Sequence, residues 1–568
     1  MTAPRPTMGM TSLRICFVDS LRNALNYIRL LTHSRSEKSR KLETDRAIAL
    51  SILNTISRQS QNYVSPQPGN ILIDGMWDNP NYWVRYSLVR RALGLAAGKE
   101  RGLLGHYSRA KVKKCFSALG ITDLVDYSAA AKITKQHMKA ASALLAGVET
   151  PDDFLRLSLP DDFPSALAYD GILKRQRRAA VEISDPALPK FLAEALAHIE
   201  AANHIVEESA FDLVVLSHAL DYTYAALAWA ALKRNIPVLV LYGDYGTARF
   251  FHLKEPADLF AYPGRPTPEE MSCMPPDIQE HLHEQGALQL RARLTGKTDD
   301  VGAVYAYQRR QASVNKALLA ERFGWDPVKP VIGVYNSNWF DYPHGSGLHY
   351  FRDFLEWIEQ TLAVASAHDS VNWLFKAHPC DDWYASIRGT RLEDLVTSAS
   401  QPHIRLADKT WNGLDLIHTL DGIVTCHGTI GIEATALGTP VLVAHPGWYG
   451  HAGFVVNPAS RDNYLAALRT EWWKTLDKEA ARQRAELFAG WMFCVPNWHG
   501  NYAMQDDSRQ DAIYSELLGF LTDNTTAMDR EVQEIRDWFE VGHPYFHVFK
   551  MMRVSSFQTG LVAETLAP

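Results

Sequence analysis

The sequence predicts an α/β fold with two Rossmann-like, doubly wound domains, because a strand–helix–strand pattern occurs in each half of the chain. Residues 211–242 contain two apolar runs of strand length separated by a helix-forming segment, and residues 421–445 repeat that order. Continuous apolar strands that alternate with helices are typical of a parallel sheet covered on both faces.

The length of the chain also calls for more than one hydrophobic core. A chain of 568 residues exceeds the size of about 250–300 residues at which single cores stop growing. Breaks in composition place a helical N-terminal extension at 1–65, a first domain with helical insertions at 66–327 and a second domain at 328–505. Residues 506–568 are expected to form helices that pack back on the first domain.

The strands of the first domain are expected at 70–75, 211–217 and 237–242, each followed by a loop with polar side chains. Residues 278–322 are predicted to be largely helical and, from their charges, partly exposed. Further helices are expected at 84–97, 110–119, 129–146, 169–180, 189–208 and 225–234.

A new series of strands begins after Pro330, with a helix at 350–367 between the first two. Loops at the carboxyl ends of parallel strands are the usual ligand position in open α/β sheets, so the loops that follow these strands are candidate ligand sites. The five strands are expected at 331–335, 371–376, 404–407, 422–425 and 441–444.

Composition excludes several classes of protein. Lys and Arg number 58 against 64 Asp and Glu, a net charge of −6 that does not suit a nucleic-acid-binding protein. The six cysteines form no CxxC pair, so we predict no zinc site and no disulfides, and expect a cytoplasmic location. The 21 histidines are scattered, and neither a metal site nor a cofactor is predicted.

No apolar run reaches the length needed to cross a membrane. Residues 13–31, however, have the pattern of an amphipathic helix that carries Arg14, Arg22 and Arg29. Such a helix can lie on a membrane surface, which would place the protein peripherally at the inner face of the membrane. Packing against its own domain or a partner is the alternative.

The turn at 426–429 is the strongest candidate site. It precedes a helix, so its free N–H groups favour an anion, and Gly428 allows a ligand to approach the backbone. The Thr429 hydroxyl is expected either to cap the helix or to contact a phosphate. Glu433 lies four residues later on the same helix face, where it could hold a ribose. The alternative is an ordinary capped helix with an exposed glutamate.

Two further loops are expected at the same edge of the second sheet. One carries Lys376 and His378, whose side chains suit a phosphate, and the other carries Asn336, Ser337 and Asn338. A strand-to-helix connection made of ordinary turn-forming residues is the alternative for the second loop. No Walker loop, nucleophile elbow or HExxH motif occurs in the chain.

Acids follow the expected strands of the first domain. A carboxylate that faces the second domain could act as a general base or a nucleophile. Asp221 and Asp244 are the preferred candidates, and Arg249 could assist an anion. Asp74 and Asp78 occupy comparable positions after the first strand.

These motifs resemble a known family. KAHP at 376–379 and GTIGIEATALGTPVLV at 428–443 resemble the donor domain of GT-B glycosyltransferases, most closely the bacterial capsule-polysaccharide group that includes retaining β-Kdo transferases. Residues 211–246 resemble the acceptor-side domain of that group. The resemblance implies that His378 and Thr429 contact the donor phosphate and that Glu433 holds the ribose. The Cys-His-Gly-Thr turn departs from the Ser-rich turn of the family, which makes His427 either an extra phosphate ligand or a substrate contact.

The expected function is therefore metal-independent transfer of a sugar, with Kdo from CMP-Kdo as the candidate, from a nucleotide-sugar donor to a surface polysaccharide or glycolipid acceptor. A CDP-alcohol-dependent polyol-phosphate transferase of capsule or teichoic-acid-like polymers is one alternative. A non-catalytic nucleotide-sugar-binding assembly protein is an alternative of another class. The sequence leaves open the sugar, the acceptor, the stereochemical outcome and the oligomeric state.

Overall fold

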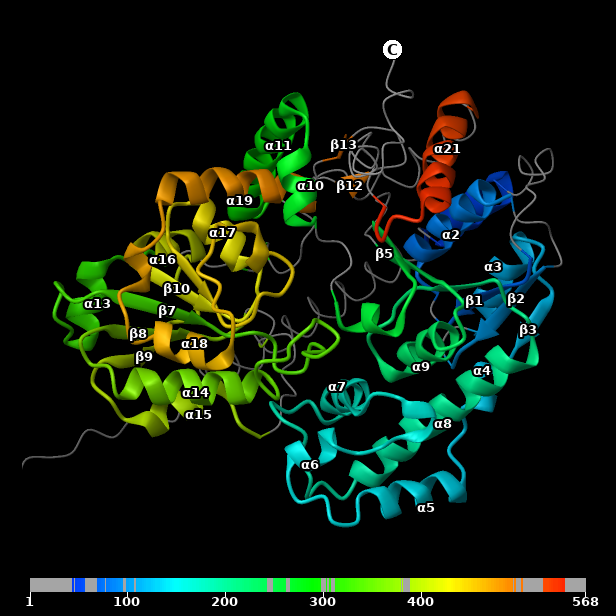
Figure 1. The fold of residues 1–568 in the computed structure, drawn as a ribbon, viewed down its shortest axis with the longest axis horizontal. Coiled ribbons are helices and arrows are strands. Elements are labelled where there is room, and N and C mark those ends of the chain that lie inside the picture. The colour runs from blue at the N-terminus through cyan, green and yellow to red at the C-terminus, as the bar shows by residue number, and fades with distance from the viewer. Residues whose placement is uncertain are drawn as a thin grey trace, which may run out of the picture.

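Two α/β domains lie side by side in the computed structural model (Figure 1). The structure describes residues 43–44, 46–56, 69–76, 78–94, 99–106, 109–242, 249–261, 266–297, 303, 306–307, 312–378, 381, 389–493, 495–496, 502–503 and 525–546. The amphipathic segment predicted at 13–31 and the predicted acid Asp244 lie outside these residues.

The sheet of the first domain has the strand order β3-β2-β1-β4-β5-β6. Neighbouring strands are parallel from β3 to β5, whereas β6 runs antiparallel to β5 at the edge. The chain adds strands to one side of β1 up to β3 and then to the other side from β4 onward, so the strand order reverses between β1 and β4. Doubly wound sheets bind ligands at such a switch point. The strands are β1 (Ile71–Gly75), β2 (Glu100–Leu104), β3 (Asp123–Val125), β4 (Leu213–Leu216), β5 (Val238–Tyr242) and β6 (Arg249–Leu253).

Helices cover both faces of this sheet, and a helical insertion between β3 and β4 extends below it (Figure 1). The core is apolar on both faces, with Leu72 and Val214 on one side and Ile71 and Val215 on the other, as strand alternation requires. The helices are α2 (Pro80–Ala92), α3 (Arg109–Ala118), α4 (Tyr127–Ala130), α5 (Lys135–Leu144), α6 (Pro151–Leu155), η2 (Pro160–Asp162), α7 (Ser165–Gln176), α8 (Leu188–Glu208), α9 (Tyr222–Leu232) and η3 (Pro256–Phe260).

The second sheet has five parallel strands in the order β11-β10-β7-β8-β9. Its switch point lies between β7 and β10. The elements are β7 (Val331–Tyr335), β8 (Asn372–Lys376), β9 (Ile404–Leu406), β10 (Gly422–Thr425), β11 (Val441–Val443), α13 (Lys316–Phe323), α14 (Phe354–Ser366), α15 (Leu392–Ala399), α16 (Gly413–Thr419), α17 (Ile430–Ala436), η6 (Gly450–Ala452), α18 (Arg461–Ala467) and η7 (Trp472–Lys474).

Helix α11 (Pro276–Leu294), which follows α10 (Pro268–Cys273), packs on α17 and on α19 (Lys478–Phe493) of the second domain. The crossing with α19 is close, because a Cβ added at Gly286 would overlap the Glu486 carbonyl and one at Gly490 would overlap Leu282. After the short β12 (Val495–Pro496) and β13 (Tyr502–Ala503), α21 (Thr525–Val541) packs on α2 of the first domain (Figure 1).

The predicted fold class is confirmed, with two Rossmann-like sheets in one chain. Three details differ from the sequence reading. β2 and β3 lie between the expected helices, where no strand was predicted, and β6 adds an antiparallel edge strand. Helix α11 is not simply a partly exposed segment, since Gly286, Leu290 and Arg293 are buried against the second domain.

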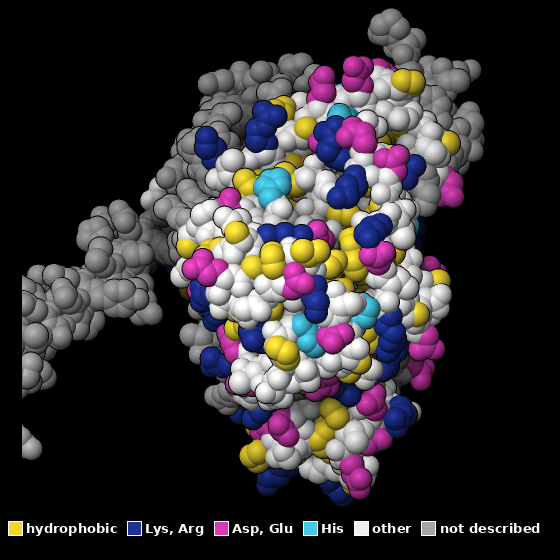
Figure 2. All heavy atoms as spheres, turned by 90° about the vertical axis from the view of Figure 1, so that its left-hand side faces the viewer, with side chains coloured by type: hydrophobic (Ala, Val, Ile, Leu, Met, Phe, Trp, Pro, Cys, Tyr) yellow, Lys and Arg dark blue, Asp and Glu magenta, His cyan; other side chains and the backbone are white. Residues whose placement is uncertain are grey.

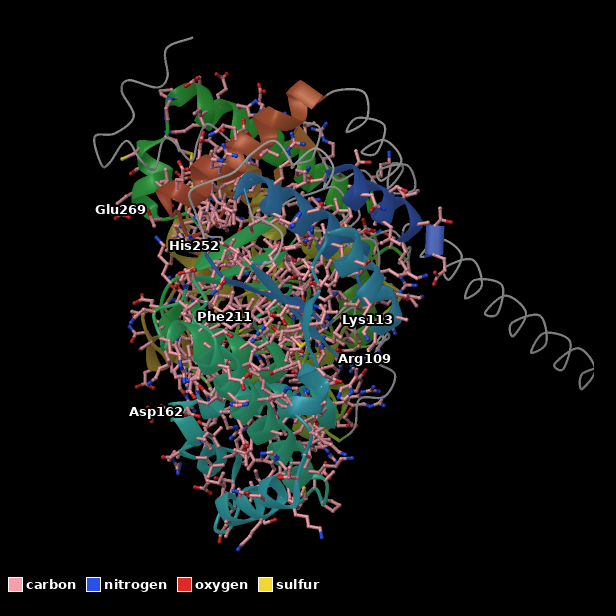
Figure 3. All side chains as sticks on the ribbon, turned by 90° about the vertical axis from the view of Figure 1, so that its right-hand side faces the viewer. Arg109, Lys113, Asp162, Phe211, His252 and Glu269 are labelled. Carbon is pink, nitrogen blue, oxygen red and sulfur yellow. The ribbon has the colours of Figure 1, made fainter. Side chains whose placement is uncertain are left out.

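The outer faces of the two domains carry mixed side chains. Basic, acidic and hydrophobic groups are interspersed on the second domain (Figure 2). On the first domain, Arg109 and Lys113 of α3 lie on one side and Asp162 on the other (Figure 3). Within the described residues, no helix is long and apolar enough to cross a membrane.

Candidate functional site

Two cavities open at the carboxyl ends of the second sheet. One, of about 330 Å³, lies within the second domain at the switch point between β7 and β10, and we call it the donor cavity. The other, of about 530 Å³, lies between the domains, and we call it the interdomain cleft. Ser337, His378, Gly428 and Thr429 line both cavities, so the two spaces meet at these residues.

The structure brings all seven predicted donor-binding residues to these cavities. Besides the four shared residues, Lys376 and Glu433 line the donor cavity, and His427 lines the interdomain cleft. They come from the ends of β7, β8 and β10 and from α17, which reach one edge because the strands are parallel. Their individual roles in binding remain predictions.

Lys376 supplies a positive charge to the donor cavity. The side chain ends β8 and is 8% exposed, with Nζ 4.9 Å from the centre of the Tyr335 ring. Such a cation–π contact helps to hold an ammonium group in place. An anionic ligand in the donor cavity would therefore meet a desolvated, positioned cation.

Glu433 differs most from its predicted surroundings. Its carboxylate is buried and accepts hydrogen bonds from Arg293 Nε at 2.9 Å and from the Tyr307 hydroxyl at 2.5 Å. The Arg293 guanidinium in turn lies 4.5 Å from the centre of the Phe493 ring. Each carboxylate oxygen has further acceptor capacity, so this arrangement is compatible with a ribose hydroxyl as an additional donor. The exposed-glutamate alternative is wrong.

Thr429 does not cap α17. Its own backbone is helical, with φ −53° and ψ −23°, and its side chain makes no capping hydrogen bond. An N-cap residue needs an extended backbone to fold its oxygen back over the first turn, which explains the difference. The cap predicted for this hydroxyl is therefore absent, and its contact with a phosphate stays a prediction.

Asn336 adds an unpartnered amide to the donor cavity. It is 5% exposed, and among the residues that the structure describes neither Oδ1 nor Nδ2 has a hydrogen-bond partner. Asn338, which lines the interdomain cleft, is equally buried, and its Oδ1 also lacks a partner. Enclosed polar atoms without partners cost about 1–3 kcal/mol each, so both positions favour a bound polar group.

His427 is held against the wall of the interdomain cleft. Its ring lies near Phe354 and His445, and its enclosed Nδ1 has no hydrogen-bond partner in the described part of the chain. Burial lowers the pKa of His427 to about 4, so the imidazole is neutral at neutral pH. A neutral ring can hydrogen-bond to a substrate but adds no positive charge for a phosphate.

Asp221 is engaged within the first domain. It caps α9 by accepting from Thr223 N at 3.0 Å, and it pairs with Arg175 Nη1 at 2.7 Å. Burial opposes ionisation, but the charge and hydrogen bonds of Arg175 lower the pKa of Asp221 below its ordinary value. Asp221 is not among the described residues that line the two cavities.

Asp74 and Asp78 also have structural contacts. Asp74 is fully buried at the first switch point, where it accepts from Met76 N and from the Ser217 amide and hydroxyl. Asp78 pairs with Arg46. The Arg249 backbone belongs to β6, and its side chain lies outside the described part of the structure.

The loop after β7 is fixed to the first domain by a buried ion pair. Asp170 of α7 accepts from His344 Nδ1 at 2.7 Å and from Gly345 N at 2.9 Å. The adjacent Tyr169 donates its hydroxyl to Asp353 Oδ2 at 2.6 Å. Because Gly345 lines the interdomain cleft, these contacts set the shape of one cleft wall.

Sequence reasoning missed Arg293, Tyr307, Asp170 and His344. Each contacts a partner more than 100 positions away, with Arg293 and Tyr307 separated from Glu433 by 140 and 126 residues. No local pattern reports such a pairing. The one available signal was that residues 278–322 combine a helical pattern with apolar positions, which is also what a packed helix requires.

Two Rossmann-like domains with a ligand-sized cavity between them define the GT-B architecture, and the strand orders assign this chain to that fold class. No protein-family model matches the sequence, and the search of curated proteins returned no match. Solved structures match at low sequence identity and low TM-score.

Among these is a β-Kdo 2,4-transferase, KpsC, of Thermosulfurimonas dismutans, with 15% identity over 49% of this chain and 79% of that chain, at a TM-score of 0.28. The UDP-GlcNAc 2-epimerase of Neisseria meningitidis bound to UDP-GlcNAc has 12% identity over 79% of this chain and 99% of its own, at a TM-score of 0.20. A glycosyltransferase of kitacinnamycin has 13% identity over 84% and 100%, at a TM-score of 0.20.

Proposed function

We propose that this protein is a glycosyltransferase that binds a nucleotide-sugar in the donor cavity and an acceptor glycan or glycolipid in the interdomain cleft. The observation that carries the proposal is that the two cavities meet at Ser337, His378, Gly428 and Thr429. A transfer reaction needs two substrates whose reacting ends share one point, whereas a simple binding protein needs only one cavity.

Ser337, His378, Gly428 and Thr429 form a wall that both cavities share, which we call the shared wall. The chemistry at this wall supports the assignment. Transfer of a sugar leaves negative charge on the nucleotide phosphate, and fixed cations and donors stabilise such charge best when water is excluded. Lys376 offers a buried ammonium group, and His378 lies two residues further along the same loop. The predicted ribose contact at Glu433 would place the nucleoside deeper in the donor cavity, with its phosphate toward the shared wall.

Kdo from CMP-Kdo is the sugar we propose, on the resemblance of residues 376–379 and 428–443 to capsule-polysaccharide transferases. A CDP-alcohol donor, with transfer of a polyol phosphate, is the competing chemistry. Both donors carry cytidine, so cytidine recognition supports either one, and the identity of the transferred group separates them.

A binding and turnover experiment tests the proposal. Thermal shifts with CMP, CDP, UDP and GDP should show stabilisation by cytidine nucleotides, and CMP-Kdo should then be turned over with release of CMP. His378→Ala should weaken nucleotide binding about tenfold by loss of a phosphate hydrogen bond. The exposed His204, which pairs with Glu208, provides a matched control in His204→Ala.

Three outcomes would count against it. Stabilisation by UDP alone would remove both cytidine-based donors. Binding without any release would favour the nucleotide-sugar-binding assembly protein. Release of CMP from CDP-glycerol but not from CMP-Kdo would favour the polyol-phosphate transferase.

A further inference from the structure

The first-domain wall of the interdomain cleft presents a histidine that the site described so far does not use. His218 follows β4, at the carboxyl end of the strand beside the first switch point. It lines the cleft together with Tyr242 and Phe251 of the same domain. It therefore faces the space in which an acceptor would lie, opposite the wall formed by the second domain.

The ring of His218 is held while its nitrogens are left available. Its centre lies 5.9 Å from that of Tyr224 and 6.1 Å from that of Tyr242. Within the described part of the chain no hydrogen bond reaches either ring nitrogen, and neither is among the enclosed polar atoms that lack a partner. Two aromatic neighbours thus orient an imidazole whose lone pair can accept a proton from a ligand.

The other acids and bases of the cleft are less suited to that role. Asp258 accepts from the backbone N–H groups of Lys254 and Glu255, and Asp341 is an exposed side chain 3.6 Å from Lys174 Nζ. His427 has a pKa of about 4, so it is a weak base, and its Nδ1 is enclosed. His378 lies on the shared wall, where the donor phosphate is proposed to bind.

We propose that His218 is the general base that deprotonates the acceptor hydroxyl, an inference that rests on the proposed transferase function. A ring nitrogen of His218 takes the hydroxyl proton while the acceptor oxygen forms a bond to the anomeric carbon of the donor sugar. The bond from that carbon to the phosphate oxygen breaks, and its electron pair leaves with the nucleotide. The imidazolium then returns its proton to solvent.

The surroundings of His218 keep it neutral at neutral pH, as a base requires. Burial lowers its pKa below the ordinary 6.5, with a smaller opposing effect of nearby carboxylates. The groups with which it interacts are Asp221 on its own loop, Lys174 of α7, Asp341 of the loop after β7, and the rings of Tyr224 and Tyr242.

The test follows release of CMP from CMP-Kdo and of UDP from UDP-GlcNAc, with water or an added glycan as the acceptor. His218→Gln and His218→Phe should lower kcat by about 10²- to 10⁴-fold, because both remove the proton acceptor and the second keeps an aromatic ring. The concentration of CMP or UDP that gives half of the maximal thermal shift should stay within about twofold of the wild-type value. His252→Gln is the matched control, since burial also lowers the pKa of His252, to about 4, but that side chain does not line the cleft.

The pH profile separates a base from a structural residue. For the wild type, kcat/KM should rise with pH through the pKa of His218, below 6.5, and then level off. In His218→Gln that acidic limb should disappear. Retention of the limb, or a kcat within about threefold of wild type in both variants, would overturn the inference while leaving the transferase proposal in place. A wild type that neither binds nor releases a nucleotide would instead refute the transferase proposal, and the base with it.

Discussion

Replacing Asp170 by Asn removes the charge from the ion pair that joins the two domains. Asp170 is fully buried and His344 is 8% exposed, so neither group can turn to bulk solvent when its partner is lost. Breaking a buried pair by neutralising one partner typically costs about 3–5 kcal/mol. Because about 1.36 kcal/mol corresponds to a tenfold change, the equilibrium between the closed and open states of the loop that carries His344 should shift at least 10²-fold toward the open state.

The effect should depend on pH in a defined direction. Burial lowers the pKa of His344, but the charge and hydrogen bond of Asp170, with help from Asp353 and the Arg352 backbone, raise it overall above 6.5. Tyr169 of α7 packs edge-on against the ring. A histidine with a raised pKa stabilises the folded state fully below its unfolded pKa, and that contribution is lost as pH rises through the folded value. Wild type and Asp170→Asn should therefore differ most near pH 6 and least near pH 9.

Hydrogen–deuterium exchange of the peptide that covers residues 342–353 measures this opening directly, after correction for the intrinsic exchange rate at each pH. The Gly345 amide, which donates to Asp170, lies within that peptide. Glu200→Gln is the matched control, because Glu200 pairs with His137 at 2.8 Å but is 74% exposed and should contribute less than about 1 kcal/mol. Equal protection in wild type and Asp170→Asn, or a difference that does not change with pH, would refute the reasoning.

Three other perturbations test the packing and the donor cavity. Gly286→Ala should lower the free energy of unfolding by about 1–3 kcal/mol in urea titrations, since its Cβ would overlap the backbone at Glu486; an unchanged midpoint would contradict the close crossing. Lys376→Met should weaken CMP binding about tenfold or more in calorimetry while removing most of its salt dependence, and unchanged affinity would exclude a phosphate at this position. Glu433→Gln neutralises the carboxylate that pairs with the buried Arg293 and should destabilise the protein by about 3 kcal/mol even without nucleotide, as scanning calorimetry would detect.

The sequence contained the information for the strands that position the site. Apolar runs at 331–335, 371–376 and 422–425 matched β7, β8 and β10, because fully buried parallel strands have a strong local signature. From those strands, the shared edge and its loops followed. The sequence did not predict β3, because this edge strand is short and only partly buried and so has no continuous apolar run.

The chemistry of individual groups was less predictable, because it depends on partners brought in by packing. Glu433 could be placed on a helix, but its burial depends on α11 docking against α17. Asp221 could be placed after β4, but its ion pair depends on Arg175 from the helical insertion. His218, three residues before it, was part of the same loop, and only the cleft distinguishes the two.

The docking of α11 also determines how this protein can be divided into fragments. A fragment that begins at residue 328 contains every strand of the second sheet, yet it omits Arg293 and Tyr307 and leaves the Glu433 carboxylate without its counter-charge. It would also expose the surface of α19 that Gly286 and its neighbours cover. A fragment that begins before Pro276, the first residue of α11, keeps the partners of Glu433 and the cover of α19. The fragment to express for nucleotide-binding studies therefore has to include a helix that precedes the sheet.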